Sequence, residues 1–159
     1  MPVDPVCGAQ IDERAATTGR RRKSEIRNSS AVVRILVVDD FEPSRRFLCE
    51  TLQGRPDLQI IGEASDGLQA VEKFEELQPD LILLDIGLPK LNGIEVAHRI
   101  SELVPSSTIL VISQNNDTDV VAAALSNGAK GYILKHNANR ELLPAVEAVL
   151  RGDHFVSAG

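Results

Sequence analysis

The feature that most constrains the fold is an apolar run, Leu81-Ile82-Leu83-Leu84, which ends in Asp85 and then breaks into a turn. Four aliphatic residues without alternating polar partners are typical of a strand that is covered on both faces, as in the centre of a parallel sheet. The residues that follow include four turn formers: Gly87, Pro89, Asn92 and Gly93. Asp85 is therefore predicted at a strand end, the edge where ligands bind in open parallel sheets. For an isolated aspartate, capping or solvating the loop is the simpler interpretation.

Strand-like and helix-like segments alternate along the chain from Val32 to Arg151. The strand-like segments are rich in aliphatic and β-branched residues: 32–38, 58–64, 81–84, 108–112 and 131–134. Segment 58–64 alternates more between apolar and polar residues, so it is expected nearer an edge of the sheet. The intervening segments have apolar residues at helical spacing, and Asp66 and Asp117 are predicted to cap two of the helices. This alternation predicts an α/β fold, a parallel sheet of five strands with helices on both faces.

Proline residues bear on two of the predicted helices. Pro43 suits the first turn of a helix that carries Phe47 and Leu48 among its apolar positions. Pro144 lies inside the last helix, predicted from about Ala138 to Arg151. Because proline lacks an amide hydrogen, that helix either begins near Arg140 or is kinked.

Polar side chains follow four of the predicted strands at their carboxyl ends: Asp39, Asp40, Asp85, Ser113 and Lys135. The carboxyl ends of parallel strands share one edge of the sheet, so these side chains should converge there. Three carboxylates that converge repel one another, and keeping them together requires a cation. Their oxygen ligands suit Mg²⁺ better than a softer metal.

Such a site has the chemistry for phosphoryl transfer to an aspartate. A carboxylate oxygen can attack phosphorus to form an acyl phosphate. Lys135 and Ser113 are of the types that stabilise charge on the phosphoryl oxygens. The motifs contain no histidine, cysteine or additional base, so no dedicated catalyst for a second, hydrolytic half-reaction is apparent.

These elements together resemble a response-regulator receiver domain of two-component signalling, from about Val32 to Gly152. The motifs that carry the resemblance occur in order: Val37-Val38-Asp39-Asp40, Leu84-Asp85-Ile86, Leu88-Pro89, Asn92-Gly93, Ile112-Ser113 and Gly131-Tyr132-Ile133-Leu134-Lys135. The family implies a flavodoxin-like, doubly wound sheet with strand order 2-1-3-4-5. The loop after Asp85 and the ending 150–157 are similar to receivers that precede a LuxR-type helix-turn-helix.

The resemblance implies that Asp85 is the phospho-acceptor and is phosphorylated by a histidine kinase or a phosphotransfer protein. It also implies that Asp40, Asp85 and the backbone carbonyl of Gly87 bind Mg²⁺, with Asp39 binding through water. Lys135 would pair first with Asp85 and then with the phosphoryl group.

The resemblance further implies a binary switch rather than an enzyme with turnover. Ser113 would close onto a phosphoryl oxygen and Tyr132 would turn inward behind it, repacking the surface around the fourth helix and fifth strand. A homodimer formed on phosphorylation is one candidate output. Two positions depart from the family pattern, namely Gln114, where Ala is common, and His136, where many receivers have Pro or Asp. Both bear on kinetics rather than on identity.

Composition and charge indicate one domain with an N-terminal tail in this 159-residue chain. Residues 1–31 lack hydrophobic periodicity and contain Arg20-Arg21-Arg22-Lys23, so we expect a disordered, polar and basic tail before a receiver domain at 32–159. The tail carries a net charge of +2 and the remainder −8. An acidic body repels nucleic acid, so direct DNA binding is not expected. We expect a cytoplasmic protein, because no signal peptide or membrane-spanning run is apparent.

Three interpretations of the function stay open. The first is a receiver that acts alone through protein contacts. The second is the regulatory part of a transcription factor whose DNA-binding domain is absent from this chain. The third is a haloacid-dehalogenase-like phosphatase, which would normally need a second acid two residues after the nucleophile, where this sequence has Gly87.

Overall fold

The structure is a computed structural model that describes residues 31–157. The predicted tail, 1–31, lies outside the described residues except for Ala31. The proposed division of the chain at about residue 31 therefore stays a prediction.

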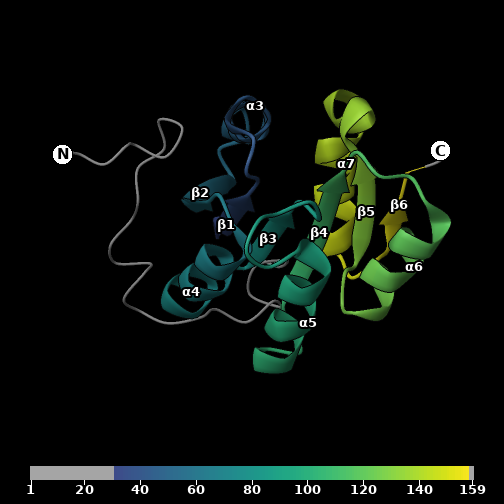
Figure 1. Cartoon of the computed structure of the whole chain (residues 1–159). Helices are drawn as coiled ribbons and strands as arrows, with labels where there is room; N and C mark the ends of the chain where they lie inside the picture. Colours follow the sequence, from purple (N-terminus) through teal and green to yellow (C-terminus); the bar gives the residue numbers. More distant parts are fainter. Residues whose placement is uncertain (1–30, 158–159) are drawn as a thin grey trace.

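A parallel sheet of six strands lies at the centre of the fold, in the order β2-β1-β3-β4-β5-β6 (Figure 1). The strands are β1 Val33–Val38, β2 Leu58–Ala64, β3 Leu81–Leu84, β4 Thr108–Ser113, β5 Gly131–Leu134 and β6 Phe155–Val156. The predicted doubly wound sheet with strand order 2-1-3-4-5 is confirmed. The short β6, which extends the sheet beyond β5, was not predicted.

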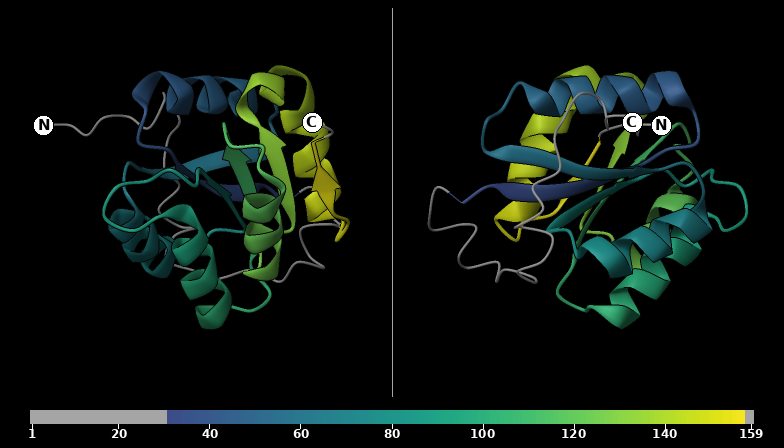
Figure 2. Two further views of the ribbon diagram at one scale, coloured as in Figure 1. Left: turned by 45° about the vertical axis from the view of Figure 1, so that its right-hand side comes forward. Right: turned by 90° about the vertical axis from the view of Figure 1, so that its left-hand side faces the viewer.

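Helices cover both faces of the sheet. On one face lie α3 Glu42–Gln53 and α7 Ala138–Leu150, and on the other lie α4 Gly67–Leu77, α5 Gly93–Leu103 and α6 Thr118–Ser126 (Figure 2). A 3-10 turn, Lys135–Asn137, joins β5 to α7. Two hydrophobic cores result, one on each face of the sheet. The strands between them are fully buried because both of their faces are covered.

The predicted helix caps at Asp66 and Asp117 are confirmed. The Asp66 side chain accepts a hydrogen bond from the Gln69 amide, and Asp117 accepts one from the Asp119 amide. These bonds satisfy amides that have no partner within the first turn of a helix.

The structure decides one open alternative and corrects one expectation. The last helix begins at Ala138 and contains Pro144, so a start near Arg140 is wrong. The helix continues past the proline because the residues after it, Ala145 and Val146, are buried against the sheet. Phe47, expected on the apolar face of α3, is 41% exposed, and the buried positions of that helix are Leu48, Cys49 and Leu52.

None of the helices between residues 31 and 157 has the length and apolar character that crossing a bilayer requires.

Candidate functional site

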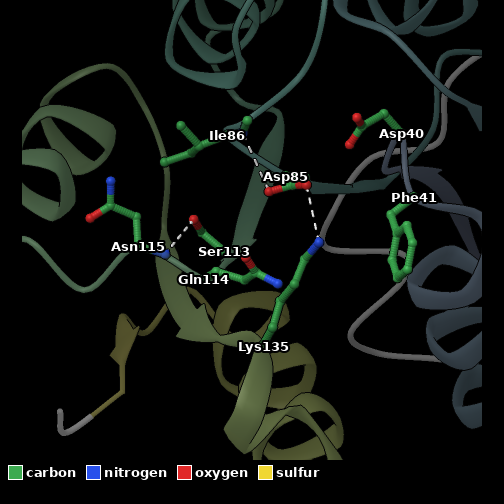
Figure 3. A pocket seen from close by; sticks show the side chains of 9 residues that line it. Asp40, Phe41, Asp85, Ile86, Ser113, Gln114, Asn115 and Lys135 are labelled. Atoms are coloured by element: carbon green, nitrogen blue, oxygen red, sulfur yellow. Dashed lines mark hydrogen bonds and ion pairs between the residues drawn. The ribbon is translucent and has the colours of Figure 1, made fainter.

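The predicted site residues lie together at the carboxyl edge of the sheet. Asp39 follows β1, Asp85 follows β3, Ser113 is the last residue of β4 and Lys135 follows β5. Figure 3 shows side chains from three of these strand ends, those of Asp85, Ser113 and Lys135, around one cleft, with Asp40 beside them. Parallel pairing of β1, β3, β4 and β5 brings the strand ends to the same edge, although the residues are far apart in sequence.

Three carboxylates are the main source of charge in the site. Asp39 is buried, Asp85 is 8% exposed and Asp40 lies at the surface. One carboxylate oxygen from each of the three lies within 4.8 Å of the others, a spacing that could hold a metal ion. Such an arrangement is unfavourable unless a cation offsets the repulsion.

Lys135 supplies one such cation. Its Nζ lies 3.0 Å from Asp39 Oδ2 and 3.1 Å from Asp85 Oδ2. Asp39 is held further by the Phe41 amide at 2.9 Å and by the Ser44 hydroxyl at 2.6 Å. The Asp39 side chain is therefore fixed by local donors, whereas Asp85 remains open to the cleft.

The pKa values of Asp85 and Lys135 shift for different reasons. Burial and the nearby Asp39 charge raise the pKa of Asp85, and the opposing attraction of Lys135 does not cancel this effect. Burial alone would lower the pKa of Lys135, but its hydrogen bond to Asp39 and the charge of Asp85 raise it overall. Lys135 therefore stays protonated at neutral pH, and the ionised form of Asp85 carries a free-energy cost that a further cation would reduce.

A close backbone approach shapes the loop after Asp85. A Cβ atom on Gly93 would lie 2.3 Å from the Asp85 carbonyl oxygen, so only glycine fits there. The Gly93 amide donates to the Ile86 carbonyl at 2.8 Å, and Asn92 caps α5 by accepting from the Glu95 amide. The Asn92-Gly93 pair thus folds the loop back against the strand end that carries Asp85.

Gly87 lies in this loop and lines the cleft. Its amide is 3.4 Å from Asp85 Oδ1. The suggested role of its carbonyl as a metal ligand stays a prediction.

Ser113 and Tyr132 are joined through the backbone of Asn115, a residue that the sequence did not single out. The Asn115 amide donates to Ser113 Oγ at 3.0 Å, and the Tyr132 hydroxyl donates to the Asn115 carbonyl at 2.6 Å. The Asn115 side chain also accepts from the amide of Asp117, the cap of α6. Turn-forming residues at 115–117 predict a loop, but a backbone group that serves two side chains leaves no signal in the sequence.

The cleft itself measures about 480 Å³ and is open to solvent near Asp85. Its lining consists of Asp40, Phe41, Asp85, Ile86, Gly87, Ser113, Gln114, Asn115 and Lys135. Gln114 is exposed on its wall, and His136 is exposed beside Lys135. The carboxylate oxygens fit a hard cation such as Mg²⁺, and the cleft leaves room for a phosphoryl group next to Asp85.

The domain is a doubly wound sheet with clustered carboxylates and a lysine at its carboxyl edge. The family model for the response regulator receiver domain matches residues 35–147. The chain therefore belongs to the response regulator receiver family.

Individual relatives support this assignment. The chain is 38% identical over 123 residues to the nitrate/nitrite response regulator protein NarL of Escherichia coli K12, a match that covers 77% of this chain and 57% of NarL. The receiver domain of a putative response regulator NarL from Mycobacterium tuberculosis has a TM-score of 0.73 and 31% identity, over 77% of this chain and 98% of that one.

A LuxR-family response regulator from Aurantimonas sp. SI85-9A1 gives a TM-score of 0.75 and 30% identity, over 79% of this chain and 89% of that one.

The similarity to NarL of Escherichia coli covers little more than half of the length of NarL. The family match leaves the haloacid-dehalogenase-like alternative without support.

Proposed function

We propose that this domain is a phosphorylation switch in which Asp85 accepts a phosphoryl group from a histidine kinase or a phosphotransfer protein. The observation that carries the proposal is the position of Asp85, because its carboxylate faces an open cleft beside Lys135 and two further carboxylates. Asp39 is the more buried of the two carboxylates paired with Lys135 and already has two other hydrogen-bond donors. Asp85 is therefore the better nucleophile.

In the proposed reaction a carboxylate oxygen of Asp85 attacks phosphorus, the bond from phosphorus to the donor nitrogen breaks, and an acyl phosphate forms. Asp40, Asp85 and the Gly87 carbonyl would hold Mg²⁺ directly, and Asp39 through water. What the metal supplies is positive charge against the carboxylates and the phosphoryl oxygens. Lys135 would neutralise the phosphoryl group from the other side, and the Ser113 hydroxyl would donate to it.

Ser113 can take this role while its oxygen still accepts from the Asn115 amide. Its hydroxyl, which also interacts with the Tyr132 side chain, would turn its hydrogen toward a phosphoryl oxygen. Any movement of Ser113 would reach Tyr132 through Asn115, and Asn115 also contacts the cap of α6. The surface of α6 and β5 is therefore the proposed output face, with a partner protein or a second copy of the domain as its ligand.

The proposed activity is a switch and not turnover, because the cleft residues include no histidine or cysteine that could activate water. The test is to incubate the protein with phosphoramidate and Mg²⁺ and follow its intact mass. We expect the addition of a single phosphoryl group, little addition in EDTA and no steady hydrolysis of a small phosphomonoester. Steady hydrolysis would favour a phosphatase.

A second candidate is that this receiver is the regulatory part of a transcription factor. It is favoured by relatives that are transcriptional regulators, such as the transcriptional regulatory protein LiaR of Bacillus subtilis, 35% identical over 122 residues. The match covers 58% of LiaR. Genomic sequence beyond Gly159 tests this candidate, since an in-frame helix-turn-helix would support it and a stop codon would favour a receiver that acts alone.

A further inference from the structure

The C-terminal strand β6 is bound to the outer edge of β5, the strand that carries Tyr132 (Figure 1). Phe155 and Val156 pair with Gly131 and Tyr132, and the Ser157 amide donates to the Tyr132 carbonyl at 2.8 Å. A strand of two residues forms too few ladder bonds to be stable alone. Residues 155–157, which we call the C-terminal strap, must therefore be held by other contacts as well.

Side chains provide these contacts. Ser157 Oγ accepts from the Leu134 amide at 3.0 Å, and its hydroxyl donates to a carboxylate oxygen of Glu141 in α7. Phe155 packs against the core between the sheet and α7. A Cβ atom on Gly131 would lie 2.9 Å from the Phe155 carbonyl oxygen, so the absence of a side chain there allows the strap to approach. Side-chain hydrogen bonds, apolar packing and the space beside Gly131 therefore hold the strap against β5.

Val156 lies beside Tyr132 on the same face of the sheet, because residues paired in register on neighbouring strands point the same way. Both line a second, mainly apolar cleft of about 300 Å³. The opposite wall of this cleft comes from α6 and includes Val121 and Leu125. Since β6 is outside β5, Val156 stands between Tyr132 and the edge of the sheet.

Tyr132 connects this region to the Asp85 cleft. Its side chain is only 1% exposed, and its hydroxyl donates to the Asn115 carbonyl. The Asn115 amide donates to Ser113, which lines the cleft with Asp85. Direct contacts therefore run without a break from the Asp85 cleft to the strap.

We propose that the C-terminal strap holds Tyr132 in its inward position, so that Val156 and Ser157 act as positioning residues for the response to phosphorylation. An outward turn of the Tyr132 ring would bring it toward the sheet edge that Val156 occupies. The strap and a phosphoryl group on Asp85 then favour the same position of Tyr132, and each stabilises the other. This coupling rests on the proposed function, whereas the effect of the strap on Tyr132 does not.

The first experiment uses Tyr132 as its own reporter. The chain contains one tyrosine and no tryptophan, so intrinsic fluorescence reports this ring alone. The variant Val156→Ala/Ser157→Ala removes the wall and both Ser157 side-chain bonds, and we expect acrylamide to quench its fluorescence severalfold more strongly than that of the parent. His154→Ala, at an exposed position of the same segment, and Val156→Ile/Ser157→Thr should behave like the parent. Unchanged quenching in the first variant overturns the proposal.

The second experiment tests the coupling on the full chain. After incubation with phosphoramidate and Mg²⁺, with uptake verified by intact mass, the peptide that contains the strap should exchange its amide hydrogens about fivefold more slowly, at the lower end of usual coupling. Full uptake with unchanged exchange overturns the coupling and leaves the proposed function standing. Absence of uptake in the parent defeats the proposed function, while the quenching comparison still decides the role of the strap. Ser157→Ala alone replaces the double variant if the latter does not fold.

Discussion

The ammonium of Lys135 lies 3.1 Å from a carboxylate oxygen of Asp85, from which it is separated by 50 residues in sequence. The same ammonium lies 3.0 Å from Asp39, whose side chain is 1% exposed. The positive charge of one lysine thus offsets the repulsion between two carboxylates at neighbouring strand ends.

This relationship predicts that Lys135 stabilises the fold when no metal is bound. Lys135→Met should lower the free energy of unfolding in EDTA by about 2 kcal/mol, the usual loss for a hydrogen bond to a charged group. Mg²⁺ should restore much of that loss, because a bound cation offsets the same repulsion. The control is Lys90→Met, since the Lys90 side chain is 63% exposed and lies 3.6 Å from Asp66, and surface pairs contribute at most about 1 kcal/mol. Denaturant unfolding of Lys135→Met that matches the parent in EDTA contradicts the prediction.

Asp85 should have the opposite effect on stability. Burial and the neighbouring Asp39 raise its pKa, which means that the ionised carboxylate costs the folded state free energy at neutral pH. Asp85→Asn should therefore raise the thermal midpoint in EDTA, and the gain should shrink in Mg²⁺. Asp40→Asn, at an exposed position, should change the midpoint less. A lower midpoint for Asp85→Asn in EDTA rules out this account of the charge balance.

The buried Arg34 in β1 connects the sheet to the end of α4 through hydrogen bonds. Its guanidinium donates to the carbonyls of Gln78 and Leu77, at 2.7 and 2.6 Å. Arg34→Met should lower the free energy of unfolding by about 3 kcal/mol. Arg34→Lys should recover only part of the loss, because an ammonium lacks the planar fork that serves two carbonyls.

The matched control for Arg34 is Arg46→Met, whose side chain is 62% exposed and pairs with Glu42 along α3. Urea unfolding should leave that variant within about 0.5 kcal/mol of the parent. Equal losses for the two substitutions would argue against a specific role of the buried guanidinium.

The Asp66 cap should stabilise the protein in a pH-dependent way. The Gln69 amide, and to a lesser extent Lys90, lowers the pKa of Asp66. The stabilisation is therefore present above the ordinary aspartate pKa and is lost as pH falls through the lowered value. Asp66→Ala should cost about 1 kcal/mol at neutral pH, and the difference from the parent should narrow in acid. Asp66→Asn, which keeps the cap acceptor, is the control, and a cost for Asp66→Ala that is independent of pH contradicts the expectation.

The sheet and most of the site could be predicted because both follow from the pattern of apolar residues along the sequence. The nearly continuous aliphatic run before Asp39 and the continuous run before Asp85 predict buried parallel strands, and parallel strands bring their carboxyl ends to one edge. Ser113 and Lys135 follow from the same rule. The structure places Asp85, Ser113 and Lys135 around the cleft and the buried Asp39 against Lys135, while their roles in phosphoryl transfer remain the proposal made above.

Other features could not be predicted because they depend on tertiary contacts. β6 has only two residues. It is held by hydrogen bonds of Ser157 and can approach β5 because Gly131 has no side chain. These contacts leave no periodic pattern in the sequence. Asn115 acts through its backbone, so its side chain gives no indication of that role. Arg34 interrupts an apolar run, and its burial depends on carbonyls more than 40 residues away.

The central claim is that Asp85 accepts the phosphoryl group, and intact-mass analysis of the parent and Asp85→Asn, each treated with phosphoramidate and Mg²⁺, tests it most directly. Asp119→Asn, at an exposed position in α6, serves as the matched control. We predict that the parent and the control gain the mass of one phosphoryl group and that Asp85→Asn gains none. Unchanged labelling of Asp85→Asn would contradict the account.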